Sequence, residues 1–377
     1  MVRSALFSLL LGTALVAPLI VAPVMAQTDS QPVTGQPTVE PTAEQTADQL
    51  RQDALAMVYS SNVVTPAAEE GLRRLEAAAE AGDVKADIEV GKLFLYGTMF
   101  PEDWARARRH FDRAAEKGDH AGLADYGMMM MWREKGWKEA QTLLEQAAQN
   151  GVPSAWVTLA EGAMYGYLGG GEHSRAKFEG YAEKARAAGQ DRIAVLEADR
   201  MLWGISVPAS GKAALQHLTA AADAGNAEAA RRLIALMRRG NDWNVPNDNA
   251  GARAALEKYA ALFAEEDQWR IATAIQAAAQ RTPEALAQLR QTVDARPELV
   301  NRGFAADLVD ANRNAAISLL QARLNAAGHE AGPTDGLAGP ATLRAMNAAC
   351  VKLLQPARCT DSVLRNDVIA DLIAALG

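Results

Sequence analysis

The sequence is poor in aromatic residues, in cysteine and in clustered basic residues. Phenylalanine, tyrosine and tryptophan make up 6% of its 377 residues, and there are two cysteines. Aspartate and glutamate (46) outnumber lysine and arginine (38), which gives a formal net charge of -8 without any basic tract. Because nucleic-acid partners require clustered Lys and Arg to neutralise phosphates, we expect no nucleic-acid partner.

The motifs of the common catalytic and metal sites are also missing. There is no GxSxG elbow and no Walker phosphate loop, and the glycine run at 166–174 is not followed by Lys-Ser/Thr. The histidines fall in different segments without HxxxH or HExxH spacing. They are His110, His120, His173, His217 and His329. We therefore predict a protein that is not an enzyme and that has no cofactor and no metal.

Long apolar runs are missing beyond the first 26 residues. In that stretch Arg3 precedes an apolar run from Ala5 to Val24, and the run ends at Ala26 with residues that a signal peptidase accepts. This pattern predicts a signal peptide at 1–26 and a periplasmic mature protein without a transmembrane anchor. The alternative is a retained membrane anchor, because the run is nearly long enough to span a bilayer.

The segment after the predicted cleavage site, residues 27–47, is rich in Gln, Thr and Pro and lacks large apolar side chains. Such a composition cannot bury a core, which predicts a disordered linker. From residue 48 onward, alanine-rich segments with apolar residues at helical spacing predict helices.

A phrase of the type AAxxG or AxxxG recurs five times between residues 76 and 225. Its glycines are spaced by 36, 33, 38 and 36 residues: Gly82, Gly118, Gly151, Gly189 and Gly225. A near-constant period in this range signals a helical repeat array. A second glycine follows 15 residues later in four units, at Gly97, Gly166, Gly204 and Gly240. In the remaining unit Arg133 stands there, and the glycine comes at Gly136.

Each part of the repeat has a physical reason. The paired alanines let two helices approach closely, and the glycine fits the left-handed conformation that often ends a helix. The second helix carries apolar residues at helical spacing, for example Ile88, Val90, Leu93, Phe94 and Leu95. Stacked pairs bury a continuous core that one pair cannot bury alone. The predicted fold class for 48–310 is an all-α solenoid of stacked antiparallel helix pairs.

The phrases above, together with helix ends that read LYG, MYG and LWG, resemble the Sel1-like repeat, a relative of the tetratricopeptide repeat. The resemblance covers most of 67–242 in five units, and a degenerate sixth unit with capping helices is expected after 242. It implies a scaffold that binds an envelope protein partner in assembly, exopolysaccharide secretion or signalling. The candidate anchors for such a partner are Trp104, Trp137 and Trp243.

Residues 311–377 predict a small three-helix domain with a glycine-paced loop, GHEAGPTDGLAGPAT, at 328–342. The order of residues resembles the peptidoglycan-binding-like domain. The matching residues are Leu320, Gln321, Leu324, Gly328, Gly332, Asp335, Gly336, Gly339, Pro340, Thr342 and Ala345. The glycines and Asp335 are predicted to shape turns rather than touch a ligand. The third helix is expected at 362–376.

Two features of this domain leave alternatives open. Family members usually have an aromatic residue and a glutamine after the second helix, where this chain has Asn347 to Cys350, so either peptidoglycan or a protein is a candidate ligand. Cys350 and Cys359 lie nine positions apart and are expected to form a disulfide in an oxidising compartment. Two free buried thiols are the alternative, and a metal site is the poorest option.

The predicted function is that of a periplasmic scaffold that binds a protein partner through its solenoid and peptidoglycan through residues 311–377. Two other functions remain candidates. One is a periplasmic regulator of an envelope sensor or enzyme, and the other is a cell-wall hydrolase whose site no motif reveals.

Overall fold

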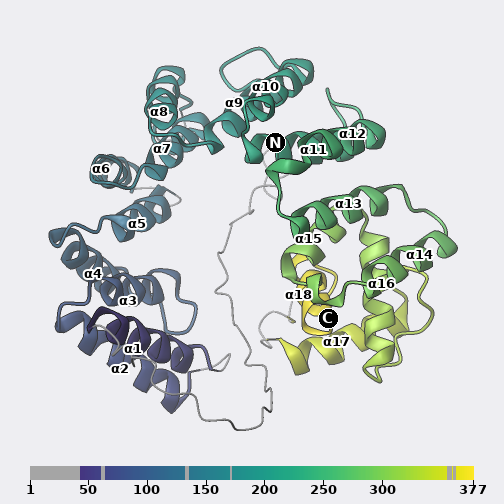
Figure 1. Ribbon diagram of the computed structural model, residues 1–377. Coiled ribbons are helices and arrows are strands. Elements are labelled where there is room, and N and C mark those ends of the chain that lie inside the picture. The colour runs from purple at the N-terminus through teal and green to yellow at the C-terminus, as the bar shows by residue number, and fades with distance from the viewer. Residues whose placement is uncertain (1–42, 61–63, 132–135, 170–171, 355–358, 360–361) are drawn as a thin grey trace, which may run out of the picture. The chain divides into compact units, whose positions relative to one another are not determined.

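All regular elements in the described part of the protein are helices (Figure 1). The computed structural model describes residues 43–60, 64–131, 136–169, 172–354, 359 and 362–377. The predicted signal peptide and the first part of the predicted linker lie outside these ranges. The first helix, α1 (Ala43–Val58), begins before the predicted boundary at residue 48. No described helix is long and apolar enough to cross a membrane.

Ten helices between residues 66 and 239 form five consecutive antiparallel pairs, each with a first and a second helix (Figure 1). The first helices are α2 (Pro66–Glu80), α4 (Trp104–Glu116), α6 (Trp137–Gln149), α8 (Arg175–Ala187) and α10 (Gly211–Asp223). The second helices are α3 (Val84–Tyr96), α5 (Ala121–Met131), α7 (Ser154–Tyr165), α9 (Arg192–Trp203) and α11 (Ala227–Arg239). The predicted solenoid of stacked helix pairs is confirmed.

The repeat glycines end these helices as predicted. All nine have positive φ, between 60° and 105°, in the left-handed region. Gly136 in the irregular unit differs, because it lies before α6 with φ -94°. The glycine period therefore marks helix ends, and the irregular unit uses its glycine to begin a helix instead.

Small residues allow neighbouring helices to pack closely, both within a pair and between one pair and the next. Each first helix buries an alanine three or four residues before its glycine, and those alanines are Ala79, Ala114, Ala147, Ala148, Ala185 and Ala222. On α4, Phe111 is fully buried against two glycines of neighbouring helices. A Cβ at Gly91 or Gly122 would come within 2.3 or 2.0 Å of the Phe111 ring. The predicted apolar face of α3 is also buried, from Ile88 to Leu95.

Second helices of neighbouring pairs also approach one another. Such approaches join α3 to α5, α5 to α7, α7 to α9, α9 to α11, and α11 to α13 (Glu265–Ala279). The first helices of neighbouring pairs approach less closely. The stack is therefore curved, with the second helices on its concave side. We use the name second-helix face for the solvent-facing surface of these helices, which are α3, α5, α7, α9, α11, α13 and α15.

After the fifth pair the chain continues with α12 (Asn249–Tyr259), which packs against α13. The remaining helices are α14 (Pro283–Asp294), α15 (Arg302–Ala311), α16 (Arg313–Ala326), α17 (Pro340–Leu353) and α18 (Asn366–Ala375). Two 3₁₀ turns, Ala260–Leu262 and Pro297–Leu299, lie between these elements. The last helix begins at Asn366, later than the predicted residue 362, and buries Val368, Ile369 and Leu372.

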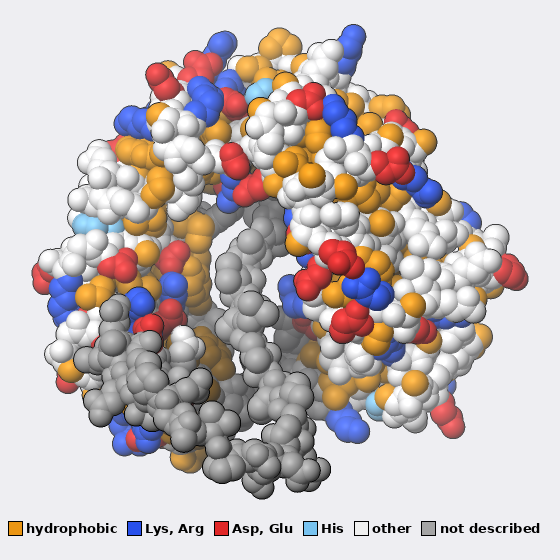
Figure 2. All heavy atoms as spheres, in the orientation of Figure 1, with side chains coloured by type: hydrophobic (Ala, Val, Ile, Leu, Met, Phe, Trp, Pro, Cys, Tyr) orange, Lys and Arg blue, Asp and Glu red, His pale blue; other side chains and the backbone are white. Residues whose placement is uncertain are grey.

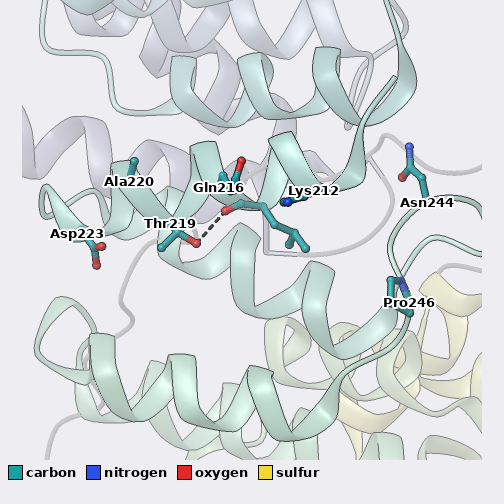
Figure 3. Close-up of a pocket in the computed structure, with 8 residues that line it drawn as sticks. Lys212, Gln216, Thr219, Ala220, Asp223, Asn244 and Pro246 are labelled. Carbon is teal, nitrogen blue, oxygen red and sulfur yellow. Dashed lines mark hydrogen bonds between the residues drawn. The ribbon is translucent and has the colours of Figure 1, made fainter. Parts of the chain in front are cut away.

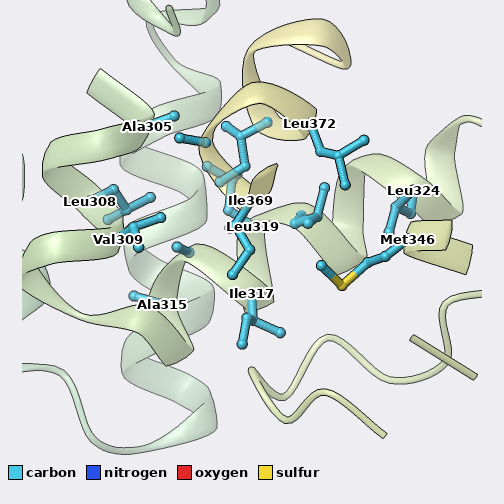
Figure 4. Packing of buried hydrophobic residues seen from close by; sticks show 14 of the residues in the cluster. Ala305, Leu308, Val309, Ala315, Ile317, Leu319, Leu324, Met346, Ile369 and Leu372 are labelled. Carbon is cyan, nitrogen blue, oxygen red and sulfur yellow. The ribbon is translucent and has the colours of Figure 1, made fainter. Parts of the chain in front are cut away.

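One hydrophobic core joins these C-terminal helices. It contains Leu308 of α15, Leu319 of α16, Met346 of α17 and Ile369 of α18 (Figure 4). The same core includes Ala277 of α13, so residues 311–377 share buried side chains with the helices before them. Acidic and basic side chains are interspersed over the face of the protein shown in Figure 2.

Candidate functional site

The loop between α16 and α17 is held in place by the side chain of Gln321, which is fully buried. Its Nε2 donates to the carbonyl oxygen of Leu337 and to Oγ1 of Thr342, both at 3.0 Å. Its Oε1 accepts the N–H of Gly336 at 2.9 Å. Thr342 in turn donates to the carbonyl oxygen of Ala331 at 2.7 Å. This network satisfies the buried backbone of the loop.

The turn residues act as the sequence indicated. Oδ1 of Asp335 accepts the N–H of Leu337 at 2.9 Å, which closes a tight turn. Gly336 has φ 82°, and a Cβ there would lie 2.4 Å from the carbonyl oxygen of Asn314. Gly328 and Gly332 also have positive φ. These residues give the loop its conformation.

The predicted motif residues therefore lie together, with the apolar and hydrogen-bonding side chains inside the domain and Gly328 and Gly332 exposed on the loop. Leu320, Gln321 and Leu324 have no exposed surface, and Thr342 is 2% exposed. Their side chains point into the network and the core, where a polymer outside the domain cannot reach them. A ligand outside the domain can reach the exposed motif positions Gly328 and Gly332, or residues outside the motif.

A groove of about 410 Å³ lies on the other side of α17. Its lining residues are Leu343, Arg344, Asn347, Cys359, Ser362, Val363 and Leu364. Arg344 and Asn347 are exposed, and a disulfide joins Cys359 to Cys350 on α17 as predicted. A guanidinium, an amide and a hydroxyl above an apolar floor suit a ligand with carboxylate and amide groups. The motif match did not include Arg344, because its place beside residues 359–364 depends on tertiary packing.

Ion pairs join neighbouring second helices along the second-helix face. Each pair connects one second helix with the next, and α13 with α15. The pairs are Lys92–Asp125 (3.9 Å), Arg192–Glu161 (2.9 Å), Arg232–Asp199 (2.6 Å), Arg231–Asp267 (2.9 Å) and Arg270–Asp307 (2.9 Å). Between α5 and α7 the described residues show no such pair. There α5 contributes the half-buried Met128 and Met129.

Several of these charges lie in partly dry surroundings. Burial raises the pKa of the carboxyl groups of Asp125, Glu161 and Asp307, and the neighbouring cations oppose this shift less strongly. Burial also raises the pKa of the Tyr165 hydroxyl, and the carboxylates of Asp199 and Glu161 add to it.

The histidines occupy separate places. His110 is buried with Nδ1 3.0 Å from Oδ1 of Asp87, and Nδ1 of His173 lies 2.6 Å from the carbonyl oxygen of Met164. His217 lies 3.3 Å from Glu197. Among the described residues, no group of three or more His, Cys, Asp and Glu side chains is placed to hold a metal ion.

Of the three tryptophans predicted as partner anchors, Trp243 is 60% exposed, whereas Trp104 and Trp137 are half-buried. Trp104 packs edge-on against Tyr126, with ring centroids 5.3 Å apart. The prediction missed Trp203, which is 42% exposed and stacks on Trp243. The signal in the sequence was the LWG helix end, but only the tertiary structure brings the end of α9 to the loop after α11.

Comparisons with known proteins give structural neighbours only. No protein-family model matches the chain, and no curated protein matches its sequence. One similar solved structure is the crystal structure of a Sel1 repeat protein from Oxalobacter formigenes, with 21% identity and a TM-score of 0.39 over 59% of this chain and 88% of that one. Another is a protective antigen of uropathogenic Escherichia coli that displays an SLR fold, with 15% identity and a TM-score of 0.36 over 86% of this chain and 72% of that one.

Proposed function

We propose that this protein is a non-enzymatic periplasmic scaffold. It binds an envelope protein partner through its helical-repeat solenoid and associates with peptidoglycan through residues 311–377. The single observation that carries the proposal is the second-helix face. Half-buried ion pairs join its helices from α3 to α5 and again from α7 to α15, and Tyr96 of α3 is partly exposed, as a polar docking surface requires.

The protein-binding part is tested by photo-crosslinking in cells. A photoreactive residue is placed at Tyr96, which is 37% exposed and lies near Asp125 of the next second helix. The matched control carries it at Lys117, which is exposed at the end of a first helix. A discrete crosslinked partner from position 96 alone is expected. Crosslinks from position 117 alone, or from neither position, contradict the proposal.

The same experiment separates a scaffold from a regulator. The crosslinked complex is isolated before and after digestion of the cell wall. A wall-tethered scaffold is expected to lose its association with the wall fraction when the wall is digested. A complex that never enters the wall fraction favours a regulator that binds its partner independently of peptidoglycan.

The wall-binding part is tested by co-sedimentation of the purified protein with isolated peptidoglycan sacculi. The groove on α17 is altered by Arg344→Ala and Asn347→Ala, which touch none of the buried loop network. We expect wild-type protein to pellet and both variants to pellet several-fold less. Leu337→Ala is the control, because Leu337 is 62% exposed but lies outside the groove. Wild-type protein that stays soluble contradicts wall association.

A further inference from the structure

Two exposed indoles form a stacked pair on the solenoid. Trp203, at the end of α9, is 42% exposed, and Trp243, in the loop after α11, is 60% exposed. Their ring centroids lie 6.2 Å apart and their planes differ by 16°. Each indole ring has one face toward the partner ring and one face away from it. Large apolar side chains so exposed and so close together mark an interaction site on a soluble protein.

The loop that carries Trp243 is rigidly built. Oδ1 of Asn241 accepts three backbone N–H groups, those of residues 243, 244 and 245, at 2.8 to 3.3 Å. Nδ2 of Asn244 donates to the carbonyl oxygen of Leu202 at 2.8 Å, directly beside Trp203. The loop is therefore preorganised, and binding to it needs little further ordering.

Backbone strain is concentrated at the same place. Among the described residues, two that are not glycine have positive φ, Ser206 at 58° and Asp242 at 56°. Ser206 lies in the loop after Trp203, and Asp242 directly precedes Trp243. Strained backbone of this kind clusters at binding sites, because the surrounding structure must maintain it.

A shallow groove of about 470 Å³ continues from this loop along α10 (Figure 3). Asn244 and Pro246 lie at one end and Asp223 at the other, with Lys212, Leu215, Gln216, Thr219 and Ala220 also lining it. The loop packs onto the first residue of α10, since a Cβ at Gly211 would lie 2.2 Å from the carbonyl oxygen of Asn244. Asn244, which lines the groove, directly follows Trp243 in the same loop, so the groove begins next to the residue that carries the exposed indole.

The charged residues that line the groove differ in whether they form an ion pair. At one end, Asp223 forms an ion pair with Lys258 at 2.5 Å and accepts a hydrogen bond from the hydroxyl of Tyr259 at 2.7 Å. Lys212 is exposed and makes no ion pair with a described residue. The surface therefore offers flat aromatic rings, uncharged amide and hydroxyl groups and the ammonium of Lys212, with the exposed carboxylate of Asp242 next to Trp243.

We infer that this surface binds an acidic polysaccharide. The apolar C–H faces of sugar rings match the exposed indole faces, the ring hydroxyls match Gln216 and the amides, and a uronate carboxylate matches the ammonium of Lys212. This inference goes beyond the proposed function, because it concerns the solenoid and does not depend on residues 311–377.

The inference is tested by fluorescence and calorimetric titration of the full-length mature protein with a uronic-acid hexasaccharide. We expect saturable binding that changes tryptophan emission. Trp243→Ala is expected to weaken it at least about tenfold, and Trp243→Phe to retain most of it. Lys212→Gln is expected to weaken uronate binding about threefold to tenfold and to remove most of its salt dependence. Leu337→Ala and Lys117→Gln are the matched controls.

A neutral hexamer of N-acetylglucosamine and isolated sacculi complete the test. No saturable binding of the uronate, equal binding by Trp243→Ala, or tighter binding of the neutral hexamer overturns the inference. If Trp243→Ala loses uronate binding while still pelleting with sacculi, the polysaccharide site and the wall groove are separate. If sacculi binding fails but uronate binding is normal, the wall proposal alone is wrong. Thermal unfolding verifies that each variant is folded.

Discussion

At the scale of single residues, two glycines with the same backbone conformation have different surroundings. Gly328 and Gly336 both have φ 82°. A Cβ at Gly328 would meet nothing within 4 Å, whereas at Gly336 it would lie 2.4 Å from a backbone oxygen. We expect Gly328→Ala to lower the free energy of unfolding by about 1 kcal/mol through backbone strain alone. Gly336→Ala should lower it by at least about 3 kcal/mol, because the loop must also move.

Chemical denaturation of both variants checks this prediction. Gly332→Ala is a second case of backbone strain alone, since the nearest atom would be a side-chain carbon in ordinary contact at 3.6 Å. Equal losses at positions 328 and 336 would mean that the close approach to Asn314 does not exist in solution.

His110 is the residue with the clearest pH effect. Burial lowers the pKa of its imidazole, the hydrogen bond to the carboxylate of Asp87 opposes this shift, and the positive charge of Arg113 adds to it. The folded pKa therefore lies below the unfolded value, so the unfolded chain takes up the proton first. As the pH falls below about 6.5, the protein should lose stability until the folded pKa is passed. This loss should be smaller in His110→Asn.

The measurement is the free energy of unfolding of both proteins between pH 5 and pH 8. The difference in free energy of unfolding between wild type and His110→Asn should change with pH below about 6.5 and stay constant between that pH and pH 8. A wild-type stability that rises on acidification, with the variant unaffected, would show that the ion pair with Asp87 dominates instead.

At the scale of elements, the alanine phrase lets a first helix pack closely against its neighbouring helices. Ala114 of α4 is fully buried, and its neighbour Ala115 is half-buried. Ala114→Leu adds three carbon atoms to a well-packed contact and should destabilise the protein by about 1–3 kcal/mol. Ala115→Leu is the control and should cost clearly less. Thermal unfolding compares the stability of the two variants. A larger loss of stability in Ala115→Leu would show that Ala115, and not Ala114, lies at the tight helix contact.

The elements themselves were largely predictable. The apolar spacing of Ile88, Val90 and Leu93, and the glycines after each helix, predicted both the helices and their ends, because these depend on local geometry. The end of the domain was predicted less well. Val363 and Leu364 continue the apolar spacing of α18, but they lie outside the helix and are half-buried. Apolar spacing does not distinguish a helix from the packed segment before it.

At the scale of the whole molecule, we expect the C-terminal helices to unfold as one unit, because they share one hydrophobic core. Met346 of α17 is fully buried and belongs to the core that includes α13 and α15. Met346→Ala should cost about 2–5 kcal/mol. Amide hydrogen exchange should then accelerate in α13 and α15 as well as in α16, α17 and α18. Acceleration confined to residues 311–377 would show an independent domain.

Ion pairs also connect α15 to α11 within the solenoid. Asp310 of α15 accepts hydrogen bonds from Arg238 and Arg239 of α11, both at 2.7 Å. A chain cut after residue 310 would keep these pairs but lose the core partners of α15. For this reason point variants of the groove test wall binding better than a truncation does.

The candidate sites were less predictable than the fold. The match at 320–342 identified residues that lie together, and the sequence itself indicated that the glycines and Asp335 shape turns. It did not show that Gln321 and Thr342 are equally inaccessible, because their burial depends on packing between α16, α17 and the loop. Arg344 and Trp203 were not predicted, since each acquires its neighbours from a distant segment.

The sequence by itself determined the helical repeat, its period and the conformation of its turns. Those features follow from backbone preferences of glycine and alanine and from apolar spacing within a few residues. Only the tertiary structure decided which side chains reach the surface together. It placed Trp203 beside Trp243, joined the second helices by ion pairs and merged α13 to α18 into one core. These are contacts between residues far apart in the chain, and local preferences do not specify them.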